Sequence, residues 1–271
     1  MSLTLVKPVK GTAEWHVPLN DNFQAIMDYA QSNDESLAGA ASLSGADFTG
    51  RVTIPTDALT VYVDPNGDDT HDGSKNAPLR SFFAAAQKVN RTLANSAAIY
   101  LADGIYDESP PENSGIYIYG KNILNIIGNA EDQSAVVLNL PIALGLYAIR
   151  CTLQGVTINT PNLPSATAVA VRGSEVLISH VTCTYTGSGQ STYGFQILGS
   201  GRITDCVVNN MSNAINIHFG SSVNVVNCSG TNNINAVRCN HGIVIASNNN
   251  IGANNGYLKI NGIIFQDGVF V

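Results

Sequence analysis

Apolar positions recur along the second half of the chain at a slowly shortening interval. The residues that align as repeat anchors are Ile126, Leu153, Ile178, Ile203, Val225 and Ile245, with gaps of 27, 25, 25, 22 and 20 residues. Internal periods of this length are typical of stacked coils, in which each repeat contacts only its neighbours, rather than of a layered globular domain.

The residues that follow each anchor keep one phase through four coils. Positions three and five after the anchor are small or apolar, whereas positions four and six are mostly polar. The inward set is Val156, Val181, Cys206 and Cys228, then Ile158, Cys183, Val208 and Gly230; the outward set at position six is Asn159, Thr184, Asn209 and Thr231. This alternation predicts strands with one buried face, cysteines that act as small hydrophobes, and an outward polar ladder.

Two helices are expected before the repeats. Residues 78–93 carry an apolar stripe, which predicts a helix from Pro78 to Leu93. Nearer the start, apolar residues between Phe23 and Ala30 follow helical spacing. That short helix needs a partner surface, which is either its own domain or an identical chain.

Three segments resemble known families. The order YVDPNGDD, DGS, AP, helix, IYLADGIY over Val61–Tyr106 resembles the opening of pectin-lyase-like proteins. Leu43–Pro55 resembles the repeat of phage tail fibres, and Trp15–Phe23 is similar to the N-terminal part of phage tail proteins. These resemblances imply an all-β chain, a right-handed single-stranded parallel β-helix whose first coil is covered by a helix, in a bacteriophage tail fibre or tail spike.

The same resemblances imply three parts and a set of partners. Residues 1–40 would attach to the phage tail or an adaptor protein, residues 41–60 would form a fibre-like linker, and residues 61–271 would form the β-helix. The last residues, Ile263–Val271, are apolar and lack a charged cap, so we expect burial against sister chains. The resemblance to tail fibres implies three chains, and therefore a homotrimer. It also implies that the protein is made in a bacterial cytoplasm and ends up in the virion.

Composition narrows the partners. Only 12% of residues are charged and the formal net charge is −7. The sequence contains no basic run, so a nucleic-acid partner is not expected. No apolar run is long enough for a membrane span, and the start is interpreted as lacking a secretory signal. The five cysteines form no CxxC pair, which argues against a disulfide framework or zinc. We expect no cofactor and a host surface polysaccharide as the ligand.

An enzymatic alternative is a polysaccharide depolymerase, either a glycoside hydrolase or a lyase. Hydrolysis usually needs two nearby carboxylates, yet the acids after Asp132 are only Glu175, Asp205 and Asp267. The register places Glu175 and Asp205 in different columns and sets Glu175 beside Arg150, which predicts an exposed ion pair.

Some weaker catalytic candidates remain. His180 and Asp205 share a predicted column, where they form either a general acid–base pair or a surface hydrogen bond. Arg202 and Arg238 are available to neutralise the carboxylate of a lyase substrate, but the register does not place them.

Candidate ligand contacts are few. Tyr185 and Tyr193 could stack on sugar rings or simply pack in turns. Asp64, Asn66 and Asp68 resemble the start of a calcium loop. However, Asp69 and Lys75 stand where an EF-hand has Gly and Glu, so the competing interpretation is a turn with side chains bonded to nearby backbone N–H groups.

Overall fold

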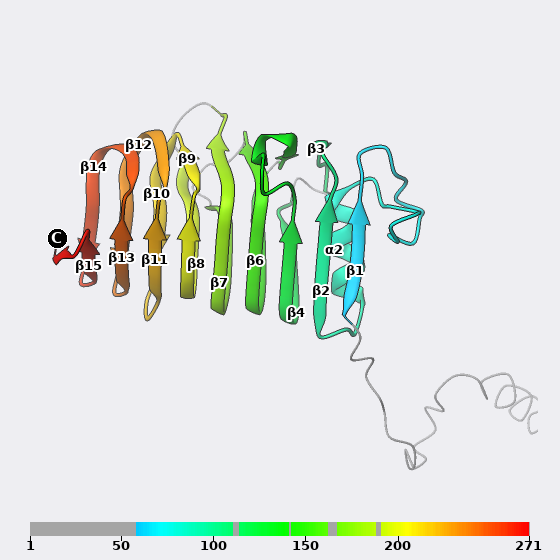
Figure 1. The fold of residues 1–271 in the computed structure, drawn as a ribbon, viewed down its shortest axis with the longest axis horizontal. Helices are drawn as coiled ribbons and strands as arrows, with labels where there is room; N and C mark the ends of the chain where they lie inside the picture. Colours follow the sequence, from blue (N-terminus) through cyan, green and yellow to red (C-terminus); the bar gives the residue numbers. More distant parts are fainter. Residues whose placement is uncertain (1–57, 111–113, 141, 162–166, 188–190, 271) are drawn as a thin grey trace, which may run out of the picture. The chain divides into compact units, whose positions relative to one another are not determined.

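The structure is a computed structural model that describes residues 58–110, 114–140, 142–161, 167–187 and 191–270. The predictions for residues 1–57, including the first helix and the tail-fibre-like segments, lie outside these residues. Nearly all described elements are strands (Figure 1). They are β1 Leu59–Val63, β2 Ser96–Leu101, β3 Gly104–Asp107, β4 Ile116–Ile127, β5 Val136–Asn139, β6 Leu144–Thr160, β7 Thr167–Tyr185, β8 Ser191–Thr204, β9 Val207–Asn209, β10 Met211–Ile217, β11 Ser222–Val226, β12 Ser229–Asn240, β13 Ile243–Ser247, β14 Asn250–Ile260, β15 Ile263–Gln266 and β16 Val269–Phe270. The helices are α2 Phe82–Arg91 and the short 3-10 helix η2 Gln133–Ala135.

The strands form a parallel β-helix, as predicted. The coils build three sheets. The first sheet, which faces the viewer in Figure 1, runs β1-β2-β4-β6-β7-β8-β11-β13-β15. The second contains β3, β5, β9 and the adjoining parts of β6, β7, β12 and β14. The third contains β10, the starts of β4, β6, β7 and β8, and the ends of β12 and β14.

The predicted inward column is confirmed in the first sheet except at its last member. Successive pairings join Val61, Ile99, Ile126, Leu153, Ile178, Ile203, Val225 and Ala246, all at most 1% exposed. Ile245 was the wrong anchor, because it pairs with Asn224 and is 50% exposed. Every side chain of β13 therefore sits one position away from the predicted register.

The second sheet follows the predicted alternation. Val156 pairs with Val181, and the polar position six pairs Asn159, Thr184, Asn209 and Thr231 across successive coils. The Asn209 amide donates to Thr184 Oγ1 at 3.2 Å, and its carbonyl oxygen accepts from Thr231 Oγ1 at 3.1 Å. The five cysteines are free and buried, and burial raises the pKa of Cys183 to about 12. The polar ladder and the inward cysteines are both confirmed.

Helix α2 is shorter than predicted at both ends. Residues before Phe82 continue alongside β1, where Asp64 N–H donates to Leu79 O at 2.8 Å. The helix begins after Ser81, whose hydroxyl accepts from Ala84 N–H at 3.1 Å. It ends at Arg91, so Leu93 lies beyond it and is 76% exposed instead of buried.

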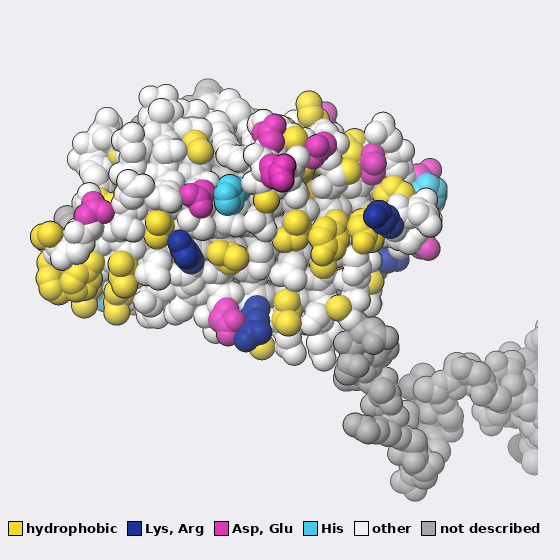
Figure 2. Space-filling model, in the orientation of Figure 1, with side chains coloured by type: hydrophobic (Ala, Val, Ile, Leu, Met, Phe, Trp, Pro, Cys, Tyr) yellow, Lys and Arg dark blue, Asp and Glu magenta, His cyan; other side chains and the backbone are white. Residues whose placement is uncertain are grey.

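The C-terminal coils are covered in part by the chain itself. β16 turns back and pairs antiparallel with β15. Lys259 pairs with Cys239 and so occupies an inward position of β14, yet it is exposed. An exposed charge at this position protects the edge of the last coils against pairing with a further strand, and the expected burial of Ile263–Val271 against sister chains stays a prediction. Val269 and Phe270 remain 66% and 70% exposed. Figure 2 shows hydrophobic side chains gathered at the C-terminal end of the β-helix.

Candidate functional site

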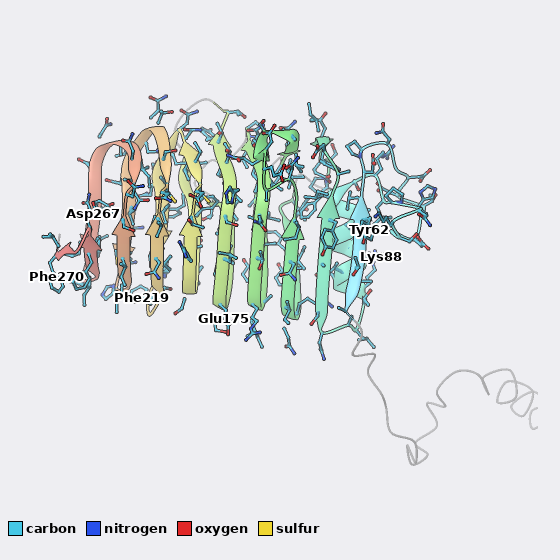
Figure 3. All side chains as sticks on the ribbon, in the orientation of Figure 1. Tyr62, Lys88, Glu175, Phe219, Asp267 and Phe270 are labelled. Carbon is cyan, nitrogen blue, oxygen red and sulfur yellow. The ribbon has the colours of Figure 1, made fainter. Side chains whose placement is uncertain are left out.

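A shallow groove of about 630 Å³ crosses the first sheet over β4, β6, β7, β8 and β11. Arg150 and Glu175 pair in register at its margin, and Figure 3 labels Glu175 at the lower end of β7. Arg150 Nε lies 2.7 Å from Glu175 Oε2, and Nη2 donates to Oε1 at 3.1 Å. The predicted ion pair is confirmed, so the Glu175 carboxylate is already neutralised by a bidentate partner.

His180 and Asp205 share a column, as predicted, at a turn that follows the first sheet. Both have left-handed backbone, with φ of 51° and 55°. Asp205 accepts from Thr204 Oγ1 at 2.8 Å and from Asn227 Nδ2 at 3.1 Å. These bonds, together with the nearby charges of His180 and Arg202, lower the pKa of Asp205. This carboxylate is therefore held ionised, which suits a hydrogen-bond acceptor rather than a general acid.

The acid–base pair is not assembled in this structure. His180 Nδ1 is buried and lacks a hydrogen-bond partner, and within the described ranges no hydrogen bond joins His180 to Asp205. Arg202 pairs with Leu177 and Asn224 and lies in the groove. Glu175 and Asp205 stand in different columns, as predicted from the register.

A second group of carboxylates surrounds a hollow of about 480 Å³ beside α2. Glu108 accepts from the N–H groups of Phe82 at 2.7 Å and Phe83 at 2.9 Å. Asp69 accepts from Ser81 N–H at 2.8 Å, and Asp107 accepts from Asn139 Nδ2 at 2.6 Å. Burial raises the pKa of Glu108. Glu108 and Asp69 thus satisfy backbone donors at the start of the helix, a role that the sequence analysis missed.

The candidate calcium residues form turns. Asp64 accepts from Asn66 N–H at 2.8 Å, and Asp68 accepts from Thr70 N–H at 2.8 Å. The Thr70 bonds lower the pKa of Asp68. Among the residues that the structure describes, no group of three or more metal-ligating side chains is found. The geometry matches the competing interpretation, in which the side chains bond to backbone two residues ahead.

The two candidate tyrosines differ in accessibility. Tyr185 is 5% exposed because it falls on the inward side of β7, so it does not present a face to a sugar ring. Tyr193 is half-buried on the third sheet. Arg238 Nη1 donates to Tyr193 Oη at 2.6 Å, with the guanidinium 5.7 Å from the ring centroid. This contact spans two coils, which is why sequence spacing did not place Arg238.

A second aromatic group lies on the third sheet and was missed entirely. Tyr119 and Tyr147 have ring centroids 5.0 Å apart and an interplanar angle of 7°. Arg172 lies 5.8 Å from the Tyr147 centroid. The sequence signal for this group is a pair of tyrosines two residues apart, Tyr117 and Tyr119, near the start of one strand, followed by Tyr147 in the next coil.

No helix in the described part of the chain combines the length and apolar character that a membrane crossing requires. No protein family matches this chain by sequence, and no curated protein does either. Among solved structures, a rhamnogalacturonan lyase is similar at 13% identity, with 77% of this chain and 66% of that chain covered and a TM-score of 0.44. The pectate lyase Pel9A is similar at 17% identity, with 72% of this chain and 54% of that chain covered and a TM-score of 0.39. The chain thus spans less than two thirds of either protein, and neither likeness assigns it a function.

Proposed function

We propose that this chain is a structural and glycan-binding subunit of a bacteriophage tail fibre or tail spike. One observation carries the non-enzymatic part: three acids of the β-helix, Glu175, Asp205 and Glu108, already serve other groups. Glu175 pairs with Arg150, Asp205 is bonded to Thr204 and Asn227, and Glu108 caps α2. Such an arrangement gives a rigid polar surface and leaves no facing pair of carboxylates among these residues.

The phage assignment rests on sequence resemblance. Leu43–Pro55 resembles tail-fibre repeats and Trp15–Phe23 resembles N-terminal tail segments. In this proposal residues 1–40 attach to the tail or an adaptor protein, residues 41–60 link, and the β-helix meets a host surface polysaccharide in the mature virion.

Assembly as a homotrimer is part of the proposal. Its support is the apolar cluster on the last coils, where Ile263, Val269 and Phe270 are 44%, 66% and 70% exposed. A cyclic oligomer buries the same surface on every chain. Sedimentation equilibrium at micromolar concentration should give three times the chain mass, and a Phe270→Ser variant should shift the equilibrium toward monomer. A wild-type monomer over the whole range would refute this assembly.

A depolymerase is the second candidate. Its support is Arg202 in the groove near Asp205, together with the unpartnered His180 Nδ1. A lyase would use the arginine to neutralise a substrate carboxylate and a base to remove a proton.

Product analysis separates the two candidates. The full chain is incubated with purified capsule and lipopolysaccharide of candidate hosts, and binding, new reducing ends and new unsaturated ends are measured. The structural proposal expects retention of polysaccharide with no new ends above a buffer control. Steady release of ends that His180→Ala abolishes would replace it with the depolymerase, and absence of binding to any surface polysaccharide would refute the glycan-binding role.

A further inference from the structure

The third sheet is free of acidic residues. Its strand segments comprise residues 116–119, 144–149, 167–173, 191–199, 211–217, 233–240 and 253–260, and none contains Asp or Glu. The chain as a whole has 20 acidic and 13 basic residues. On an acidic protein, strand segments without carboxylates repel an anionic ligand less than the acidic parts of the surface do.

Two arginines on this sheet share one arrangement. Arg172 lies 5.8 Å from the Tyr147 ring centroid, and Arg238 lies 5.7 Å from that of Tyr193. Neither takes part in the ion pairs found among the described residues. A guanidinium held against an aromatic face keeps edge N–H groups available, and these groups match the planar geometry of a carboxylate.

The tyrosines near Arg172 form a flat surface that is held in place from below. The Asn90 amide donates to Tyr117 O at 2.7 Å and accepts from Tyr119 N–H at 3.0 Å, which fixes this part of β4 on α2. A Cβ at Gly145 would lie 2.3 Å from the Tyr117 ring, so glycine at this position leaves room for the ring. Tyr119 is 53% exposed and stacks parallel to Tyr147. Aromatic faces of this kind suit the apolar faces of sugar rings.

A buried amide marks the second half of the same sheet. Asn216 is 0% exposed, and neither its Nδ2 nor its Oδ1 has a hydrogen-bond partner. It pairs with Gln196 on one side and Arg238 on the other. Its neighbours Ile215 and Ile217 point inward, so strand alternation directs Asn216 outward. An unsatisfied buried amide costs free energy, so a polar ligand group that reached Asn216 would gain a hydrogen bond without displacing an existing one.

We propose that the third sheet binds an acidic polysaccharide along the stack of coils, which deepens the glycan-binding function proposed above and rests on it. Arg172 and Arg238 bind sugar carboxylates, and Tyr119 and Tyr147 support sugar rings. Arg238 crosses β10 to reach Tyr193, so its movement toward a carboxylate exposes Asn216 to sugar hydroxyls.

The test compares matched ligands and matched variants of the full chain. The probes are polygalacturonate, alginate and hyaluronan, each beside its carboxyl-reduced neutral form, in a calorimetric or surface-binding assay at two salt concentrations. At least one acidic polymer should bind, its reduced form should bind at least about tenfold more weakly, and salt should weaken the binding. Arg172→Gln and Arg238→Gln should each lower the affinity by about tenfold. Arg80→Gln is the control and should leave the affinity unchanged, because the Arg80 side chain is 66% exposed beside Asp69 and lies outside the third sheet. Arg202→Gln reports separately on the first sheet.

The outcomes separate this proposal from the broader function. Equal binding of acidic and neutral forms, or full affinity in Arg172→Gln, would overturn the acidic-sugar site while glycan binding stands. A loss caused by Arg202→Gln alone would move the site to the first sheet. Binding of no acidic probe, beside retention of a neutral host polysaccharide, would overturn only this inference. Binding of no glycan at all would remove the function as well.

Far-UV circular dichroism and melting show whether each variant is folded, and the exposed Arg172 keeps the test decisive if Arg238→Gln unfolds.

Discussion

The coils before His180 and those from His180 onward make their turns differently. In the described residues, all nine non-glycine residues with positive φ lie at or after His180. Along the inward column of the first sheet the interval falls from 27 residues between Ile99 and Ile126 to 21 between Val225 and Ala246. The early coils turn through longer connections, and their left-handed positions are all glycines. The late coils keep some left-handed glycines, such as Gly220 and Gly268, and add left-handed Asn, Asp or His residues.

The difference shows two ways to stabilise a stacked coil. A left-handed non-glycine residue costs roughly 1 kcal/mol, and in the late coils side-chain ladders offset it. Asn227 Nδ2 donates to Asp205 Oδ1 at 3.1 Å, and Asn248 Nδ2 donates to Asn227 Oδ1 at 2.6 Å. The early coils rely on large aliphatic side chains: every buried leucine in the described residues lies at or before Leu153.

Deleting volume from an early coil should have the largest effect. Leu153 is 0% exposed and pairs with Ile126 and Ile178. Leu153→Ala should lower the free energy of unfolding by about 2–5 kcal/mol, the range for a buried leucine. Urea unfolding measures it, with exposed Leu177→Ala as the control, and a loss below about 1 kcal/mol would show that the early core is loosely packed.

Glu108→Gln should have the next largest effect, about 1–3 kcal/mol, because the carboxylate accepts two backbone N–H groups at the start of α2. Burial raises the pKa of Glu108 above 4.5. The folded chain therefore holds this proton more tightly than the unfolded chain, so the contribution of Glu108 is largest below pH 4.5 and declines as pH rises through the folded pKa. The difference in the free energy of unfolding between wild type and Glu108→Gln should therefore shrink as the pH rises through the folded pKa of Glu108. A gap that widens toward pH 7 would mean that the helix N–H groups, not burial, dominate.

The sequence predicted the fold well because the strand alternation is strict. The alternation of apolar and polar residues with a period of two was enough to place Val156, Val181, Cys206 and Cys228 in one inward column. Ile245 failed because Ile243, Val244, Ile245 and Ala246 are all apolar, so alternation alone does not choose a phase there. The residues with left-handed backbone identify the correct anchor. Asp205, Asn227 and Asn248 each lie two residues after a residue of the buried column, namely Ile203, Val225 and Ala246.

The candidate site was less predictable for a physical reason. Its contacts join residues one or two coils apart, as with Arg238 and Tyr193, which are 45 residues apart in the chain. Such contacts depend on the exact register and on side-chain direction. Arg150 and Glu175 were predictable because they are direct neighbours in one column.

The Asn227 position tests the late-coil strategy. Asn227 has φ of 53° and two ladder bonds. Asn227→Ala should cost about 1–2 kcal/mol, since it loses the bonds and keeps the left-handed strain. Asn227→Gly loses the same bonds but tolerates the backbone, so it should cost roughly half as much. Equal losses in urea unfolding would assign the whole effect to the ladder and none to the backbone.

The ion pair between Arg150 and Glu175, which joins the last two early coils, should have the smallest effect. Its side chains are 58% and 61% exposed, so water and salt screen the attraction despite the bidentate geometry. A double-mutant cycle with Arg150→Ala and Glu175→Ala should give a coupling below about 1 kcal/mol that vanishes in high salt. Arg202→Ala with Glu175→Ala is the control cycle, since Arg202 forms no ion pair among the described residues. A coupling well above 1 kcal/mol would mean that exposed charge pairs stabilise the early coils alongside the aliphatic core, and the contrast with the ladder-stabilised late coils would weaken.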